Sequence, residues 1–156
     1  MRVSISRKNS EQYSDPTAYA ALTAVEKSEK RQVRSSRKFM PLVYICSRYA
    51  ADEKRTVEQN EAAAVRYSQF AIEQGCIPLA SHLLYPRILD DNNPEQRKLG
   101  LFFGQVWLDI AREIWIFSDG SFSKGMKSEY DRARQRGYKM RFFNENMEEV
   151  SYEKCT

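Results

Sequence analysis

The most constraining feature of this sequence is an alternation of short apolar runs with helical segments between Phe39 and Phe143. Each apolar run is five residues long, as is typical of strands that are buried on both faces of a parallel sheet. The runs occupy residues 42–46, 76–80, 113–117 and 139–143, and the helical segments occupy 57–74, 124–136 and a stretch from Pro94 to at least Ile110. This alternation predicts an α/β domain, a small Rossmann-like or flavodoxin-like three-layer sandwich with a parallel sheet of four or five strands.

The segments also predict which side chains are buried. The helix that begins at Pro94 is apolar nearly all round, which indicates a mostly buried helix. The preceding stretch, 81–93, shows no periodicity and is expected to be a loop. Pro78 fits its predicted strand poorly, because proline has no amide hydrogen for the sheet ladder. The helix over 57–74 is expected to bury one face, formed by Ala62, Val65, Phe70 and Ala71.

The residues before Phe39 form a basic arm. Asp15 and Pro16 are a helix start, with the aspartate as N-cap and proline at the first helical position. Apolar residues then recur at helical spacing as far as Val25, so a short amphipathic helix is expected to run to about Lys30 and to fade into a basic linker. The predicted organisation is therefore an arm over 1–39, a domain over 40–143 and a frayed acidic tail over 144–156.

The positive charge of the chain is confined to this arm. The 156 residues carry 25 Lys and Arg against 21 Asp and Glu, a net charge of +4. Residues 1–40 hold nine basic and four acidic groups, whereas the remainder holds 16 basic and 17 acidic groups. A nucleic-acid interaction is therefore expected only through the arm, and the domain itself is electrically balanced.

Several classes of protein are excluded by residues that the sequence lacks. One histidine and three separated cysteines cannot form a common zinc set, so no metal and no cofactor is expected. The sequence contains neither a Walker A loop nor a GxGxxG motif, which argues against a standard NTPase or dinucleotide enzyme. No apolar stretch approaches the ~18 residues of a membrane span, so no membrane association is expected. Unpaired cysteines and a polar start favour a cytoplasmic protein with reduced thiols.

Three loops are expected to form the ligand site, because parallel sheets bind ligands at the carboxyl ends of their strands. The first loop contains Ser47, Arg48 and Tyr49, and the second contains Ser81 and His82. The third loop contains Ser118, Asp119, Gly120 and Ser123 and leads into a helix through Gly125 and Met126. Hydroxyl groups and free amides before a helix suit an anionic or hydroxyl-rich ligand. His82 is expected to form a hydrogen bond near this pocket.

Glu129 has two possible positions on the helix over 124–136. It lies three residues after Met126 and four before Ala133, which belong to the core-facing stripe. Its carboxylate therefore lies either at the rim of the pocket or on the solvent surface. Helical geometry alone favours the surface.

Three segments carry a resemblance to a known family. They are LVYICSRY at 42–49, GCIPLASHLLYP at 75–86, and IWIFSD at 114–119 followed by SKGMKSE at 123–129. In this order and spacing they resemble a bacterial and phage family of unknown function that is similar to the nucleoside 2-deoxyribosyltransferases. The resemblance spans about residues 40–143. It implies a flavodoxin-like sandwich whose pocket receives a nucleoside or nucleotide derivative, and it implies a homo-oligomer.

The resemblance also implies residue roles. Glu129 matches the glutamate that attacks the anomeric carbon of the sugar, which reverses the preference for a surface position. Asp119 and Ser123 match the loop that holds sugar hydroxyls or activates the base, and the loop that begins at Ser47 matches one that positions the base or a phosphate. The transferases carry a further aspartate near the position of Gly104, where this sequence has none; Asp109 lies one turn further on.

Three hypotheses follow from these observations. The first is a protein that acts on the N-glycosidic bond of a nucleoside or nucleotide, with Glu129 as nucleophile. The second is a non-catalytic binder of a nucleotide derivative, a sensor or sequestering protein, because the acid that would assist departure of the base is missing. In the third the basic arm recruits nucleic acid or a protein partner.

Overall fold

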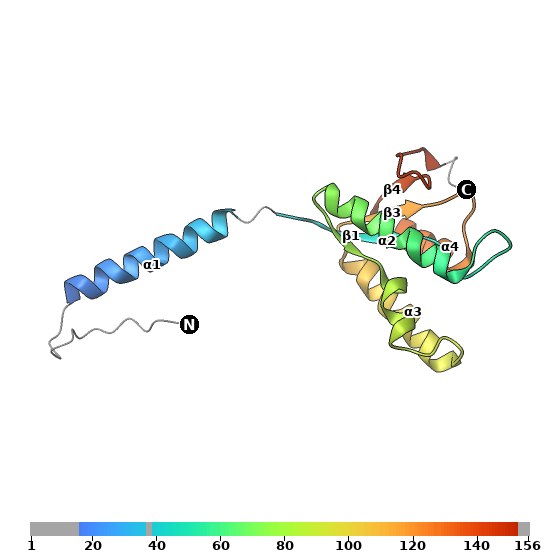
Figure 1. Ribbon diagram of the computed structural model, residues 1–156, viewed down its shortest axis with the longest axis horizontal. Helices are drawn as coiled ribbons and strands as arrows, with labels where there is room; N and C mark the ends of the chain where they lie inside the picture. Colours follow the sequence, from blue (N-terminus) through green and yellow to red (C-terminus); the bar gives the residue numbers. More distant parts are fainter. Residues whose placement is uncertain (1–15, 37–38, 153–156) are drawn as a thin grey trace. The chain divides into compact units, whose positions relative to one another are not determined.

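The computed structural model of the protein describes residues 16–36 and 39–152 (Figure 1). The chain divides into two compact units, Met1–Phe39 and Met40–Thr156. The described residues of the first unit form one helix, α1 (Pro16–Ser36), which begins where the Asp-Pro pair predicts. It is longer than expected, since it continues through the basic segment that was predicted to be a linker. Lysine, arginine, glutamine and glutamate are good helix formers, so that segment extends the helix.

The second unit is an α/β sandwich, as predicted. Its sheet contains β1 (Leu42–Cys46), β2 (Ile77–Leu79), β3 (Glu113–Phe117) and β4 (Lys139–Phe143), all parallel and in the order β2-β1-β3-β4. The connecting helices are α2 (Val57–Glu73), α3 (Pro94–Ile110) and α4 (Lys124–Arg136). Within the described residues, no helix is long and apolar enough to cross a membrane.

The direction of chain crossing changes next to β1. The chain moves from β1 to β2 on one side and then back past β1 to β3, so the switch in strand order lies between β1 and β3. Right-handed crossovers then place α2 on one face of the sheet and α3 with α4 on the other. The alternation of β1 agrees with this arrangement. Val43 and Ile45 pack with residues of α2, whereas Tyr44 and Cys46 pack with residues of α3 and α4.

The helix ends are set by local sequence. Thr56 and Gln59 form a reciprocal capping box at the start of α2, and Ser123 accepts the amide of Met126 at the start of α4. Gly75 and Gly137 follow α2 and α4 with φ angles of 76° and 68°. These left-handed conformations favour glycine and end both helices where the sequence predicts.

The second strand is shorter than predicted and includes Pro78. β2 covers only Ile77–Leu79, at the edge of the sheet, and Pro78 lies opposite Val43 of β1. An edge strand tolerates proline because one of its sides has no ladder to complete. The stretch predicted to be a plain loop contains two short 3₁₀ helices, η1 (Ser81–Leu83) and η2 (Tyr85–Arg87), so that prediction was incomplete.

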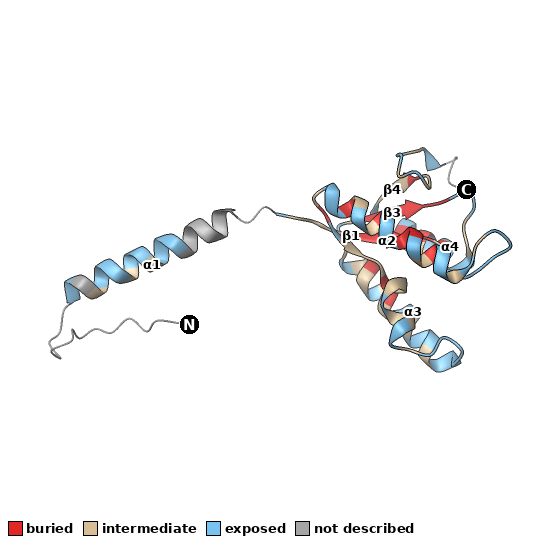
Figure 2. Ribbon diagram, viewed as in Figure 1, coloured by how far each residue is buried: buried red, intermediate tan, exposed pale blue. Residues whose placement is uncertain are grey.

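The prediction that α3 is mostly buried is wrong. Only Gly104 and Leu108 of this helix are buried, and its distal part is pale blue in Figure 2. Five large apolar side chains remain 42–59% exposed, namely Leu99, Leu101, Phe102, Val106 and Ile110. The helix covers the sheet with one narrow face, because only that face reaches Tyr44 and Ile114 in the core. The many apolar residues of α3 therefore led to a prediction of more burial than the helix has.

The predicted buried face of α2 was partly wrong. Ala62 and Val65 are exposed; the buried residues are Asn60, Ala63, Ala64, Tyr67 and Ala71. Asn60 enters the core because its amide donates to the carbonyls of Tyr49 and Ala50.

After β4, the side chain of Asn144 accepts the amides of Asn146 and Glu148, and Phe143 bridges to Glu149. Residues 1–15, 37–38 and 153–156 lie outside the described part.

The orientation of α3 gives a stability prediction. Leu108→Ala removes a side chain that is 0% exposed, so we expect a loss of about 2–5 kcal/mol in the free energy of unfolding. Leu99→Ala removes the same atoms at a position that is 43% exposed and should cost less than about 1 kcal/mol. Urea unfolding of both variants measures the difference. Equal losses would contradict the orientation of α3.

Candidate functional site

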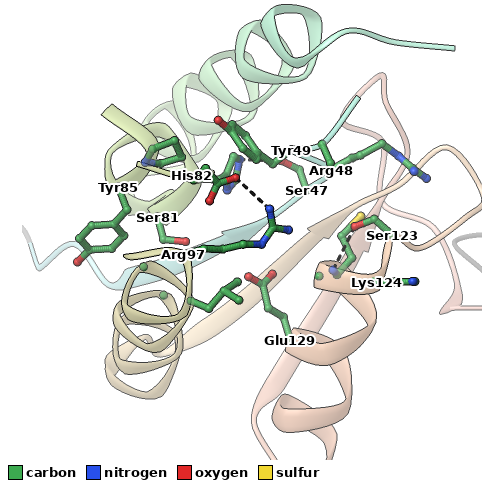
Figure 3. Close-up of a pocket in the computed structure, with 18 of the residues that line it drawn as sticks. Ser47, Arg48, Tyr49, Ser81, His82, Tyr85, Arg97, Ser123, Lys124 and Glu129 are labelled. Atoms are coloured by element: carbon green, nitrogen blue, oxygen red, sulfur yellow. Dashed lines mark hydrogen bonds and ion pairs between the residues drawn. The ribbon is translucent and has the colours of Figure 1, made fainter. Parts of the chain in front are cut away.

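A cavity of about 430 Å³ lies at the carboxyl end of β1, between α3 and the first turns of α4 (Figure 3). It has the size of a site for a small organic molecule. Loops after β1 and β2, the start of α4 and the inner side of α3 all contribute to its wall. This is the edge of the sheet that the parallel topology predicts, next to the switch in strand order.

Most of the predicted site residues line this cavity. They are Ser47, Arg48, Tyr49, His82, Ser123, Gly125, Met126 and Glu129. Ser118 and Asp119 line a separate pocket of about 20 Å³ behind the loop. The carboxylate of Asp119 accepts from Ser121 Oγ at 2.8 Å and lies 3.5 Å from Lys54 Nζ. Gly120 forms the turn itself, with a φ of 97°. Of the third loop, only Ser123 therefore reaches the cavity, whereas Asp119 is a partner of neighbouring side chains.

Glu129 turns its carboxylate toward the cavity and not toward open solvent. Its Oε1 accepts a hydrogen bond of 2.8 Å from the Tyr44 hydroxyl, and the buried thiol of Cys46 also hydrogen-bonds to it. The preference of helical geometry for a surface position is therefore corrected. Burial raises the pKa of Glu129 above its usual value, while the hydrogen bonds from Cys46 and Tyr44 oppose that rise.

Tyr44 connects three elements of the site. Its hydroxyl lies 2.8 Å from Ser81 Oγ as well as 2.8 Å from Glu129, so β1, η1 and α4 meet at one oxygen atom. Burial and the nearby Glu129 raise the pKa of Tyr44 well above 10, which keeps the hydroxyl protonated and available as a donor. Gly104 of α3 lies against this pair. A Cβ atom there would be 3.1 Å from Ser81 Oγ, so the glycine permits close packing of α3.

Tyr44, Cys46 and the Tyr44–Ser81 contact were not predicted to belong to the site. Tyr44 and Cys46 lie in an apolar run and were assigned to the core, where both are in fact buried. The signal was available in the tyrosine itself. A buried tyrosine hydroxyl requires a hydrogen-bond partner, and Tyr44 is two positions before the end of a strand that points at the predicted site.

His82 forms a polar pair with Ser47 on the wall of the cavity. The Ser47 hydroxyl lies 3.1 Å from His82 Nε2, and the Tyr49 ring is 6.3 Å from the imidazole ring. Burial lowers the pKa of His82 to about 4, so the imidazole is neutral at pH 7. A neutral imidazole can donate one hydrogen bond and accept another, but it is a weak proton donor.

The first turn of α3 and the segment before it add residues that the sequence did not single out. Arg97 lines the cavity and forms an ion pair of 3.3 Å with Asp91 (Figure 3). Gln96 accepts the amide of Asp90, and Asn93 caps the helix, which fixes the segment in place. Because α3 was interpreted as a buried apolar helix, its polar first turn was overlooked.

Asp109 does not face the cavity. Its carboxylate is held by Arg132 at 2.6 Å and by Arg136 at 3.0 Å, and these ion pairs lower its pKa. The residues of α3 that do line the cavity are Gln96, Arg97, Gly100, Leu101 and Gly104. This part of the wall therefore lacks a carboxyl group. In the described part of the chain, no cluster of three His, Cys, Asp or Glu residues could hold a metal ion.

The bond between Tyr44 and Glu129 predicts a change in acidity. Tyr44→Phe removes a donor that stabilises the carboxylate, so the pKa of Glu129 should rise further. Carbon-13 NMR titration of the glutamate carboxyl groups measures this pKa, and Glu129→Gln identifies the resonance. Tyr67→Phe, on the opposite face of the sheet, is the matched control and should leave the pKa unchanged. An unchanged or lower pKa in Tyr44→Phe would contradict the assignment.

Burial of His82 predicts a dependence of stability on pH. The folded pKa of about 4 lies below the usual 6.5, so the unfolded chain binds more protons between these values and stability falls as the pH drops through this range. The loss relative to His82→Gln should reach up to about 3 kcal/mol near pH 4, and less where water reaches the ring. The raised pKa of Glu129 changes stability with pH in the opposite direction. Glu129 is present both in the unchanged protein and in His82→Gln, so its contribution cancels in the comparison. Urea unfolding at several pH values measures the difference, and parallel curves would show that His82 is not buried.

The model of a family described as a domain of unknown function (DUF7768) matches residues 41–143, which covers the sheet, its three connecting helices and every wall of the cavity. No curated protein matches the chain.

Proposed function

The chain belongs to the DUF7768 family, and from its cavity we propose that it binds a nucleoside or nucleotide and acts on the N-glycosidic bond, with Glu129 as the nucleophile. One observation carries this proposal. The carboxylate of Glu129 lies in the wall of a cavity of about 430 Å³, where the Tyr44 hydroxyl holds it in a defined orientation. The resemblance of the surrounding segments to the nucleoside 2-deoxyribosyltransferases supports the choice of ligand.

The cavity offers surfaces that suit a nucleoside. The Tyr49 and Tyr85 side chains line it and can pack against a base, whereas Ser47, Ser81 and Ser123 provide hydroxyl groups for a sugar. Planar bases stack well on aromatic rings, and sugar hydroxyls are recognised by short polar side chains. The size of the cavity limits the ligand to a single nucleoside unit rather than a polymer.

The proposed reaction requires an ionised carboxylate. Glu129 attacks the anomeric carbon and forms a glycosyl ester, while the carbon–nitrogen bond breaks and its electron pair leaves with the base. Water or a second base then takes the sugar from the ester and restores the carboxylate. Hydrogen bonds from Tyr44 and Cys46 favour the anion and so counteract the effect of burial on its pKa.

A second function is favoured by a specific feature of the wall. The face of α3 that lines the cavity carries no carboxyl group, Asp109 is held by Arg132, and His82 is neutral. A base that departs without a proton donor loses assistance typically worth ~10²–10⁴-fold in rate. The alternative proposal is therefore a binding protein that holds a nucleotide derivative without cleaving it.

Two further expectations remain predictions. A homo-oligomer is consistent with the exposed apolar side chains of α3, because patches of this kind often mark protein interfaces. A cytoplasmic location and an interaction of the basic arm with nucleic acid rest on the sequence alone.

The nucleophile is tested by its amide variant. Glu129→Gln keeps the shape of the side chain but removes the charge, so release of free base should fall by about 10³-fold or more. The matched control is Asp131→Asn, a change of equal charge on the solvent side of α4, which should retain activity. Chromatography of free base from a panel of nucleosides and nucleotides provides the measurement. Equal release by Glu129→Gln would reject the proposed role.

The same incubations distinguish an enzyme that cleaves the ligand from a binding protein that does not. Ligands that stabilise the protein against thermal unfolding and are recovered intact support the binding protein. Ligands that stabilise it and lose their base support the enzyme. If no nucleoside or nucleotide either stabilises the protein or is cleaved, both proposals fail.

A further inference from the structure

Three cationic side chains line the cavity, and they differ in how far they are already engaged. Arg48 pairs with Asp52 at 3.0 Å and donates to Ser121 Oγ at 2.9 Å, so its guanidinium is committed to the outer loop. The side chain of Lys124 runs away from Glu129 in Figure 3. The guanidinium of Arg97, in contrast, projects into the cavity from α3, toward the carboxylate of Glu129.

In the described part of the chain, Arg97 keeps most of its donors without a protein partner. Among the described residues its guanidinium has one polar contact, from Nη1 to Asp91 Oδ2 at 3.3 Å. Nε and Nη2 have no partner in that part of the chain. The side chains of Arg97 and Asp91 are 57% and 45% exposed, and an exposed ion pair with a single contact adds little stability. Asp91 therefore orients Arg97 without consuming its capacity to bind an anion.

The chemistry of the guanidinium selects the kind of anion. Its planar arrangement of N–H donors matches two oxygen atoms of a phosphate, and such paired, charge-assisted bonds are stronger than neutral ones. Arg97 comes from the first turn of α3, whereas Glu129 comes from α4 on the other wall. One ligand can therefore meet the cation and the carboxylate with different groups.

We propose that Arg97 binds a phosphate group of the ligand, so that the substrate class of this cavity is a nucleoside phosphate rather than a free nucleoside. The inference rests on the proposed function for the nucleoside part of the ligand. The phosphate itself follows from the free donors of Arg97, and Asp91 acts as the positioning residue that aims them.

The experiment compares matched ligands on the full chain. Isothermal titration calorimetry is performed with the four 2′-deoxynucleosides, their 5′-monophosphates and inorganic phosphate. For at least one base we expect the monophosphate to bind about tenfold more tightly than its nucleoside, or better. Arg97→Gln should remove this preference, so that the monophosphate binds no more tightly than its nucleoside. Added salt should reduce the preference, because it screens the charge interaction.

Arg87→Gln is the matched control. Arg87 lies in η2 near the cavity, is exposed, and pairs with Glu61 at 3.7 Å, so the variant makes the same change of charge outside the site. It should retain the preference for the monophosphate. Circular dichroism of both variants checks that they are folded.

Each other result overturns a distinct claim. Equal affinities for nucleoside and monophosphate would overturn the phosphate site and leave the proposed function standing. A preference that survives in Arg97→Gln would show that another group binds the phosphate. If nucleosides and monophosphates all fail to bind, both the proposed function and this inference fail, whether or not inorganic phosphate binds.

Discussion

The site depends on one buried hydroxyl group. Tyr44 lies at the centre of the sheet, and its oxygen joins Ser81 after β2 to Glu129 on α4. Without this bond the carboxylate of Glu129 would lose a hydrogen-bond donor. Its ionised form would then carry a larger free-energy cost of desolvation. Gly104 completes the arrangement, because α3 can approach the pair only where it has no side chain. Three helices and two strand ends thus meet around one oxygen atom.

Burial shifts the pKa values of two groups in the cavity, Glu129 and His82, in opposite directions. Burial raises the pKa of Glu129, which disfavours its anion, and lowers the pKa of His82, which disfavours its cation. Each shift thus disfavours the charged form of its group. The donors from Tyr44 and Cys46 act against this tendency at Glu129 alone. Hydrogen bonds therefore favour the anion of Glu129, while the histidine serves as a neutral partner of Ser47.

The order of strands and helices could be predicted from the sequence, because apolar runs, caps and glycine stops are local signals. The burial of α3 and α2 could not. Leu99 and Phe102 look like core residues but are half exposed, whereas Asn60 looks polar but is buried by bonds to the loop after β1. The loops of the site followed from the parallel topology. Tyr44 and Arg97 did not, since one lies in an apolar strand and the other in a helix that was interpreted as core.

The helix α3 explains why the domain can be electrically balanced and still offer a charged site. Its first turn contributes Arg97 to the cavity, its middle contributes Gly100 and Gly104, and its outer side carries exposed apolar residues. Asp109, near its end, is neutralised by two arginines of α4. At the cavity, in contrast, the guanidinium of Arg97 has a single contact to Asp91 and keeps Nε and Nη2 without a partner among the described residues. The net positive charge of the chain comes from its arm, whereas the charge that the cavity offers to a ligand depends on which individual groups are paired.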